Sequence, residues 1–283
     1  MSDLFRGTKA TKEFYEQMGW HKKDGVLVDS VLFTPRHVGP IQKSMIECRK
    51  AAIRELIGGP GLRLLECGSG ARPALFLASR CDNFTAVDFS SVGLIEAAAK
   101  LESTGLTYRT VEADITQLPF SDGEFDVAYS AHAIYHIATP DGQSSALAEM
   151  MRVVRPGGRV VLVLANPFPL LFPGRLLRRL LAATPMIERL LNAIRPKPAL
   201  PYRPMRRGWY EKHFSKWGDV QVVGHAVPSS WFDRSIPESN GLARVAWSTI
   251  AWIEKHHPKI ASRLGCYVAI CATHRAEQPR VRR

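Results

Sequence analysis

The stretch Leu64-Leu65-Glu66-Cys67-Gly68-Ser69-Gly70 says more about the fold than any other part of the chain. Apolar residues lead into Glu66, and a Gly-x-Gly turn and the helix-forming run Ala74–Ala78 follow. A buried strand that ends in a glycine turn lets a ligand approach the backbone closely, because no side chain is in the way. The stretch therefore predicts a strand, a turn and a helix at a ligand-binding edge of an α/β sheet.

Two later apolar runs also end in an acidic residue. Thr85-Ala86-Val87-Asp88 places Asp88 22 residues after Glu66, and the run from Tyr108 ends at Asp114. In a doubly wound fold, an acid about 20 residues after the glycine turn lies at the tip of the neighbouring strand, where it binds ribose hydroxyls. We therefore expect the three acids to gather at the carboxyl edge of one parallel sheet.

The chain lacks two glycine patterns that bind phosphate groups, and their absence limits the class of nucleotide ligand. Gly68-x-Gly70-x-x-Pro73 lacks the last glycine of the dinucleotide-binding pattern, and the chain has no Gly-Lys-Ser/Thr phosphate loop. A nucleoside without phosphates fits this edge better than NAD or ATP.

Strand and helix signals alternate along the chain, which predicts an α/β fold with a doubly wound, mostly parallel sheet. Seven segments predict strands: Arg63–Cys67, Phe84–Asp88, Thr107–Glu112, Phe125–Ser130, Arg159–Ala165, Val220–His225 and Gly265–Thr273. We divide the chain into an N-terminal helical cap segment (1–57), a cofactor-binding core (58–165), a basic helical insertion or lid between strands five and six (166–217), C-terminal strands (218–274) and a basic tail (275–283).

Composition limits the class of protein. At 283 residues the chain is long enough for one α/β domain with additions, and its apolar fraction of 46% is ordinary. No apolar run reaches the roughly 20 residues that span a bilayer, and Met1–Arg6 lacks the apolar core of a secretion signal. The five cysteines form no Cys-x-x-Cys pair, so we expect reduced thiols and no metal site. A cytoplasmic protein is expected.

The excess positive charge lies in the insertion. Residues 1–165 have a net charge of −1, residues 166–217 of +9 and residues 218–283 of +4. Between Leu176 and Ile194 the insertion has leucines at helical spacing with arginines between them, and Pro185 predicts a break into two helices.

Three interpretations of the insertion stay open. It could be a lid that packs its leucines on the domain, or an amphipathic surface on an anionic membrane, which would suit a lipid-linked substrate. The +9 patch and its aromatic residues could also bind nucleic acid. Nucleic acid is the weakest of the three, because no RNA-binding module accompanies the patch.

Taken together, the motifs resemble those of the class I S-adenosylmethionine-dependent methyltransferases, and most closely the small-molecule group that includes the ubiquinone/menaquinone-biosynthesis enzymes. The motifs are Leu64–Gly70, Val87–Ser90, Ala113–Asp114, Leu118–Val127, Ala131–Ile137 and Glu149–Gly158. Arg72-Pro73 departs from the pattern, because the family usually has glycine or another small residue there.

The resemblance implies a binding site for S-adenosylmethionine. Glu66, Gly68 and Gly70 would surround the methionine part, Asp88 the ribose, and Asp114 with Ile115 the adenine. Ser69, Phe89 and Ser130 complete the expected cofactor-binding set.

Catalytic candidates follow the fourth predicted strand. Methyl transfer to a hydroxyl needs a base near the donor methyl group, and His132, Tyr135 and His136 cluster at that point of the sequence. The two histidines would share a face if the segment is helical. A purely structural role for His136 and packing by Tyr135 remain alternatives, and Asp141 and Gln143 could line the same cleft.

These observations predict an S-adenosylmethionine-dependent methyltransferase that acts on a small-molecule or lipid-linked acceptor, such as a glycan or natural product, by O-methylation. The alternatives are an RNA methyltransferase that uses the basic insertion, and a non-catalytic S-adenosylmethionine-binding regulator. Peripheral membrane contact through residues 166–217 is a further expectation, and the sequence leaves the oligomeric state open.

Overall fold

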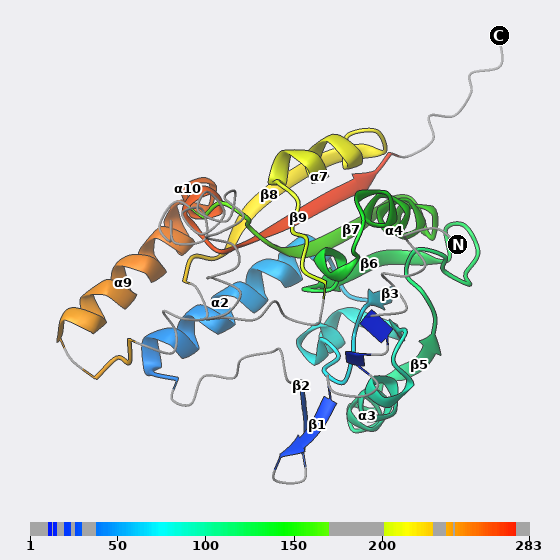
Figure 1. Ribbon diagram of the computed structural model, residues 1–283, viewed down its shortest axis with the longest axis horizontal. Helices are drawn as coiled ribbons and strands as arrows, with labels where there is room; N and C mark the ends of the chain where they lie inside the picture. Colours follow the sequence, from blue (N-terminus) through cyan, green and yellow to red (C-terminus); the bar gives the residue numbers. More distant parts are fainter. Residues whose placement is uncertain are drawn as a thin grey trace, which may run out of the picture.

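A seven-stranded mixed sheet forms the centre of the molecule (Figure 1). The computed structural model describes residues 11–12, 14–15, 20–23, 26–29, 38–169, 201–228, 236–239 and 241–275. The strands of this sheet are β3 (Leu62–Cys67), β4 (Cys81–Asp88), β5 (Thr107–Glu112), β6 (Phe125–Ala131), β7 (Val154–Ala165), β8 (Gly218–Ala226) and β9 (Tyr267–His274).

The sheet has the order β5-β4-β3-β6-β7-β9-β8. All neighbouring pairs from β5 to β7 are parallel, and β9 runs antiparallel to both β7 and β8. The predicted Rossmann-like, mostly parallel seven-stranded fold is confirmed.

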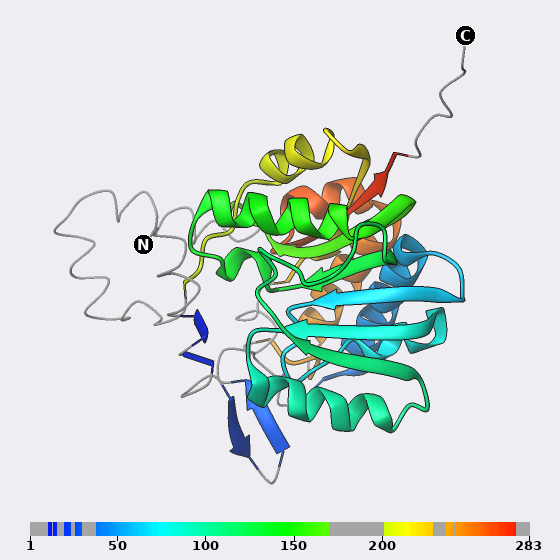
Figure 2. The ribbon, with the colours of Figure 1, turned by 90° about the vertical axis from the view of Figure 1, so that its right-hand side faces the viewer.

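Helices cover both faces of the sheet (Figure 2). Side chains alternate between the faces of a strand, so Leu64 and Val161 enter one core while Leu65 and Val160 enter the other. The first core packs under α2 (Pro40–Ile57), η2 (Leu75–Arg80) and α3 (Ser91–Glu102), and the second under α4 (Pro140–Arg152) and α7 (Arg207–Phe214). Helices α9 (Gly241–His256) and α10 (Pro258–Leu264) follow β8.

Three local features differ from expectation. The helix expected after the glycine turn is the six-residue 3₁₀ helix η2, which is short because the chain enters β4 directly at Cys81. The hairpin of β1 (Trp20–Lys23) and β2 (Val26–Asp29) was not expected. Helix α10 was also missed, although Pro258 at its first turn is a common helix start.

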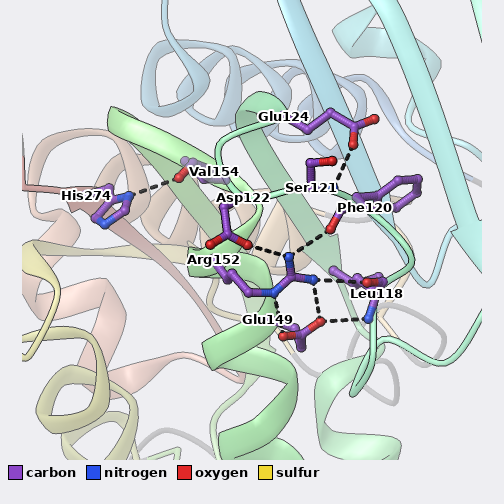
Figure 3. A network of polar contacts seen from close by, with 9 residues as sticks. All are labelled: Leu118, Phe120, Ser121, Asp122, Glu124, Glu149, Arg152, Val154 and His274. Atoms are coloured by element: carbon purple, nitrogen blue, oxygen red, sulfur yellow. Dashed lines mark hydrogen bonds and ion pairs between the residues drawn. The ribbon is translucent and has the colours of Figure 1, made fainter.

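An arginine holds the loop between β5 and β6 against α4 (Figure 3). Arg152 makes two hydrogen bonds to Glu149, at 2.7 and 2.8 Å, and one of 2.8 Å to Asp122. It also donates to the carbonyl oxygens of Leu118, at 3.0 Å, and Phe120, at 2.7 Å. This network stabilises the loop that follows β5 and its acidic end.

The insertion is described only in part. Residues 166–169 and 201–217 are described, and the helices expected between Leu176 and Ile194 lie outside the described residues. Within the described part of the chain, no helix combines the length and apolar character needed to cross a membrane.

Candidate cofactor and acceptor site

The glycine turn after β3 is tightly packed. Gly68 and Gly70 have φ angles of +76° and +51°, a region that favours glycine. The backbone N–H groups of Gly68 and Ser69 both donate to the Val87 carbonyl, at 2.7 and 3.2 Å. A Cβ atom at Gly68 would lie 2.3 Å from the Cβ of Ala133. Position 68 therefore has no room for a side chain.

Asp88 joins the turn to the start of α3. Its buried carboxylate accepts a hydrogen bond of 2.8 Å from the Gly70 N–H on one oxygen and of 2.9 Å from the Ser90 N–H on the other. Ser90 then caps α3 by accepting from the Gly93 N–H. The carboxylate is thus fixed at the edge where an acceptor for ribose hydroxyls was predicted.

Glu66 is buried at the end of β3. Its carboxyl accepts a hydrogen bond of 3.1 Å from the Ala74 N–H. Desolvation raises its pKa to about 8, and the nearby charge of Asp88 adds to this effect. Glu66 is therefore largely protonated at neutral pH, when no cation lies beside it.

Asp114 lies just past β5. One carboxylate oxygen accepts both from the N–H and from the hydroxyl of Thr116, each at 2.8 Å. The N–H of Ala113 donates to the Asp88 carbonyl at 3.0 Å, so the ends of β4 and β5 are tied together. Ile115 is buried beside this link. The three predicted acids therefore end adjacent strands on one edge, as expected.

The other three predicted cofactor residues have different surroundings. Ser130 is fully buried and donates its hydroxyl to the Cys67 carbonyl at 2.8 Å, which ties the end of β6 to that of β3. Ser69 is buried in the turn. Phe89 lies 6.0 Å, centroid to centroid, from Tyr15 of the N-terminal segment.

This edge fits an adenosyl group. Ribose hydroxyls and an adenine amino group are hydrogen-bond donors, and Asp88 and Asp114 supply fixed carboxylate acceptors for them. Gly70 carries no side chain that would keep a ligand from the backbone of the turn. Among the described residues, no group of three or more His, Cys, Asp or Glu side chains could hold a metal ion.

The predicted catalytic residues meet at the end of β6. His132 has a φ angle of +61°, which is uncommon for a residue with a side chain, and its Nδ1 lies 3.0 Å from the Tyr135 hydroxyl. The 3₁₀ helix η3 (Ile134–His136) begins only after His132, so the two histidines do not share a helix face. Both nevertheless contact Tyr135, since the His136 ring lies 4.7 Å from it.

The two histidines differ in their partners. Desolvation, with a contribution from the charge of His136, lowers the pKa of His132 to about 4, so its imidazole is neutral at physiological pH. His136 places Nδ1 2.7 Å from the Pro201 carbonyl and therefore donates to it. His136 thus anchors the chain that returns from the insertion.

Several residues of this region were not predicted. Tyr202 lies 5.3 Å from the Tyr135 ring and Tyr267 lies 5.0 Å from the His132 ring, both edge-on. His225 follows on β8, and burial, together with the charges of Arg49 and His132, lowers its pKa to about 3. None of these residues belongs to a local motif, so no sequence signal marks them.

Gln143 does not line the cleft. It is fully buried, and its side-chain amide donates to the carbonyl oxygens of Ile137 and Arg203 and accepts from the Tyr210 hydroxyl. Gln143 therefore fastens the segment after the insertion to η3 and α7. Asp141 lies in the first turn of α4.

The sheet order and the acidic strand ends define the class I methyltransferase fold. Residues 65–162 match a family model described as a methyltransferase domain. The demethylmenaquinone methyltransferase of Mycobacterium tuberculosis is 26% identical over 206 residues, which cover 72% of this chain and 74% of that protein. That of Thermus thermophilus is 37% identical over 110 residues, 38% of this chain and 49% of the relative.

Solved structures agree with the fold. The geranyl diphosphate C-methyltransferase of Streptomyces coelicolor gives a TM-score of 0.55 at 15% identity and covers 95% of this chain and 98% of its own. The [4+2]-cyclase SpnF gives 0.52 at 19% identity, with 83% of each chain covered, so the fold alone does not define the reaction.

The sequence matches identify the class of reaction, which the fold alone does not define. The chain is a class I S-adenosylmethionine-dependent methyltransferase, and it is a distant homologue of the ubiquinone/menaquinone-biosynthesis methyltransferases. S-adenosylmethionine is its methyl donor.

Proposed function

We propose that the enzyme methylates a hydroxyl oxygen of an apolar, lipid-linked acceptor, and that His132 takes up the hydroxyl proton. The observation that carries this proposal is the position of the His132 imidazole, which Tyr135 holds at the edge of the sheet and which contacts Tyr267. Its left-handed backbone costs about 1–2 kcal/mol, and strain of this kind is concentrated at functional sites.

The hydrogen bond to Tyr135 selects the useful tautomer. If Nδ1–H of His132 donates to the Tyr135 oxygen, Nε2 keeps its lone pair and accepts the proton of the acceptor hydroxyl. Tyr135 is then a positioning residue that acts through His132, in the way that a second group orients a catalytic histidine in other enzymes.

Bound S-adenosylmethionine supplies an electrophilic methyl group on a sulfonium. The protein has to orient the acceptor, exclude water and remove one proton. We assign the protein's acceleration of methyl transfer to these three effects. We assign cofactor binding to Glu66, Gly68, Ser69, Gly70, Asp88, Phe89, Asp114 and Ile115. Ser130 contributes by closing the sheet edge beneath the turn, because its hydroxyl is committed to Cys67.

The walls of the region favour an apolar ring in the acceptor. Tyr202 and Tyr267 contribute aromatic rings beside Tyr135 and His132, and an aromatic ring of the acceptor would pack well against them. The curated relatives are named for demethylmenaquinone, a lipid-linked ring, which supports an acceptor of that kind. A cytoplasmic enzyme that meets its lipid-linked acceptor at the membrane surface would suit the basic insertion at 166–217.

A second candidate is methylation at carbon. A relative from Bdellovibrio bacteriovorus is named as a C-methyltransferase. A deprotonated hydroxyl on a ring shares its charge with the neighbouring ring carbon, so the same base would serve both reactions. NMR of the product distinguishes a methoxy group from a ring methyl group, and a ring methyl group would replace the O-methylation proposal.

The proposal is tested by turnover with hydroxylated aromatic lipids and phenols, followed by mass spectrometry. We expect His132→Ala to lower kcat by about 10²–10³-fold, within the range for a lost general base, and to leave S-adenosylmethionine affinity unchanged in calorimetry. Tyr135→Phe should lower kcat less and shift its pH profile. His136→Ala serves as the neighbouring control and should mainly lower stability.

Three outcomes would decide against this function. Full turnover by His132→Ala would remove it as the base. Tight cofactor binding without turnover on any acceptor would favour the non-catalytic regulator, whereas methylation of co-purifying RNA would favour the RNA methyltransferase.

A further inference from the structure

The outer face of α9 exposes apolar side chains that the proposed reaction does not use. Leu242, Val245 and Trp252 are 85%, 64% and 54% exposed. Their spacing of three and seven residues places them on one side of the helix. Trp247 and Ile250, on the opposite side, are buried against α2 and α10. We call the exposed side the α9 face.

The exposed charges on α9 and α10 have one sign. Residues 241–264 contain four Lys or Arg residues and a single acid, Glu254. Glu254 points inward, where both of its oxygens accept from Arg49, at 2.7 and 2.8 Å. The cations, by contrast, are exposed at Arg244, Lys255, Lys259 and Arg263. The exposed charged side chains of α9 and α10 are therefore all cationic, and the nearby acid Glu238 is occupied, because its carboxylate accepts from the N–H groups of Ile41 and Gln42.

Trp252 lies near the end of α9, close to the start of α10. Its ring is 4.6 Å from that of His257 and 5.6 Å from that of His256, and Ile260 of α10 is 50% exposed. Single exposed apolar residues are normal, but a stripe with a tryptophan and a cationic border is typical of helices that lie in a membrane interface.

We propose that the α9 face docks on the surface of an anionic lipid bilayer. Leu242, Val245 and Trp252 enter the interfacial region, and the cations face anionic headgroups. A second copy of the chain fits less well, because a symmetric pair would bring the two sets of cations together. Nucleic acid would match the cations but gives no reason for exposed leucine and valine.

Docking there would bring the reaction site close to the lipid. Glu254 also accepts from the Val227 N–H, just past the carboxyl end of β8, at 2.7 Å. Tyr267, which pairs with Ala226 at this same edge, contacts His132. The inference goes beyond the proposed reaction and does not depend on it.

Vesicle binding by the full chain tests the inference. We expect the native protein to bind phosphatidylcholine vesicles that contain phosphatidylglycerol and to bind pure phosphatidylcholine much more weakly. The triple exchange L242S/V245S/W252S should lower the partition coefficient at least about tenfold. Ile95→Ser is the matched control, because Ile95 of α3 is 73% exposed on another helix, and it should change nothing.

Charge is tested separately. Lys255→Gln with Lys259→Gln should weaken binding to the anionic vesicles by about tenfold or more, and added salt should do the same. The unfolding midpoint and cofactor affinity of each variant verify that it folds. Val245→Glu probes the same face if the triple exchange does not fold.

Three results would overturn the inference. The native chain could ignore anionic vesicles, or the triple exchange could bind them as well as the native chain does, which would assign binding to another surface. Light scattering could also show a dimer that the triple exchange dissociates, which would make the face a contact between copies. None of these readouts measures turnover, so they stand apart from the test of the proposed reaction.

Discussion

The two halves of the site are built in different ways. Over β3, β4 and β5, each acid bonds to backbone close by in sequence: Glu66 to Ala74, Asp88 to Ser90 and Asp114 to Thr116. Over β6, β7 and β9, the aromatic and imidazole groups come from separate segments, and His136 is joined to Pro201, 65 residues away. We call these the cofactor half and the acceptor half.

The difference indicates how each half should respond to changes in sequence. The acids of the cofactor half are held mainly by bonds to nearby backbone, although Ser130 and Ala133 of the acceptor half pack against its glycine turn. The acceptor half depends on the chain that returns from the insertion, so a change in the insertion reshapes it. Substitutions can therefore separate the two halves.

Asp88→Ala should give the largest effect, and only in the cofactor half. It removes the acceptor for two buried N–H groups and the proposed ribose acceptor, so we expect the Kd for S-adenosylmethionine to rise at least about a hundredfold. Calorimetry measures this change. Asp82→Ala, at the exposed start of β4, is the control, and equal losses in both variants would contradict the assignment.

Gly68→Ala should damage both halves at once, because Gly68 packs against Ala133. A left-handed alanine and a Cβ–Cβ distance of 2.3 Å should together lower the free energy of unfolding by about 3 kcal/mol. Gly105 has a similar φ of +71° but open space around it, so Gly105→Ala isolates the backbone cost, about 1 kcal/mol. Equal values in urea denaturation would mean that the turn is looser than described.

Gln143→Leu should affect the acceptor half alone. It leaves the Tyr210 hydroxyl and the carbonyls of Ile137 and Arg203 without their partner, which should cost about 2–3 kcal/mol of stability. Cofactor affinity should stay unchanged, whereas a parallel loss of affinity would show that the halves are coupled. The adjacent Ser144→Ala, with weaker anchoring to His213, is a suitable comparison.

The smallest expected effect is a pH dependence from Glu66. Its raised pKa means that the folded chain holds a proton between pH 4.5 and about 8 that the unfolded chain releases, so stability falls as pH rises through this window. His132 and His225 have lowered pKa values and act in the opposite direction, but only below pH 6.5.

Between pH 6.5 and 8, Glu66 is therefore the one of these three groups that still changes its protonation on unfolding. The expected fall in stability is up to about 2 kcal/mol, since 1.36 kcal/mol corresponds to one pKa unit. Glu66→Gln should flatten the profile measured by urea denaturation, and a flat profile in the native chain would contradict the assignment.

The sequence predicts the cofactor half well because its signals are local. Both ends of the strand Thr107–Glu112 were predicted correctly, and so were the buried strands that end at Cys67 and Asp88. Strand ends such as Gly218 depended on pairing with β9, which a single segment does not reveal.

The acceptor half was predicted only in part. His132, Tyr135 and His136 are neighbours in sequence and were identified together, but Tyr202 and Tyr267 reach them through the tertiary fold. Ser130 illustrates a different limit, because its position at the end of β6 was predicted and its hydrogen bond to Cys67 was not. A hydroxyl at a strand end suits a ligand and a neighbouring carbonyl equally well.

The place of β9 has a consequence for biosynthesis. Because β9 lies between β7 and β8, neither of those strands can complete its pairing until residues Tyr267–His274 have left the ribosome. About a hundred residues are translated after β7 while its apolar edge, Val160–Ala165, waits for a partner. A nascent chain stalled in this interval would present an open strand edge, which is the kind of surface that chaperones cover and that aggregation exploits.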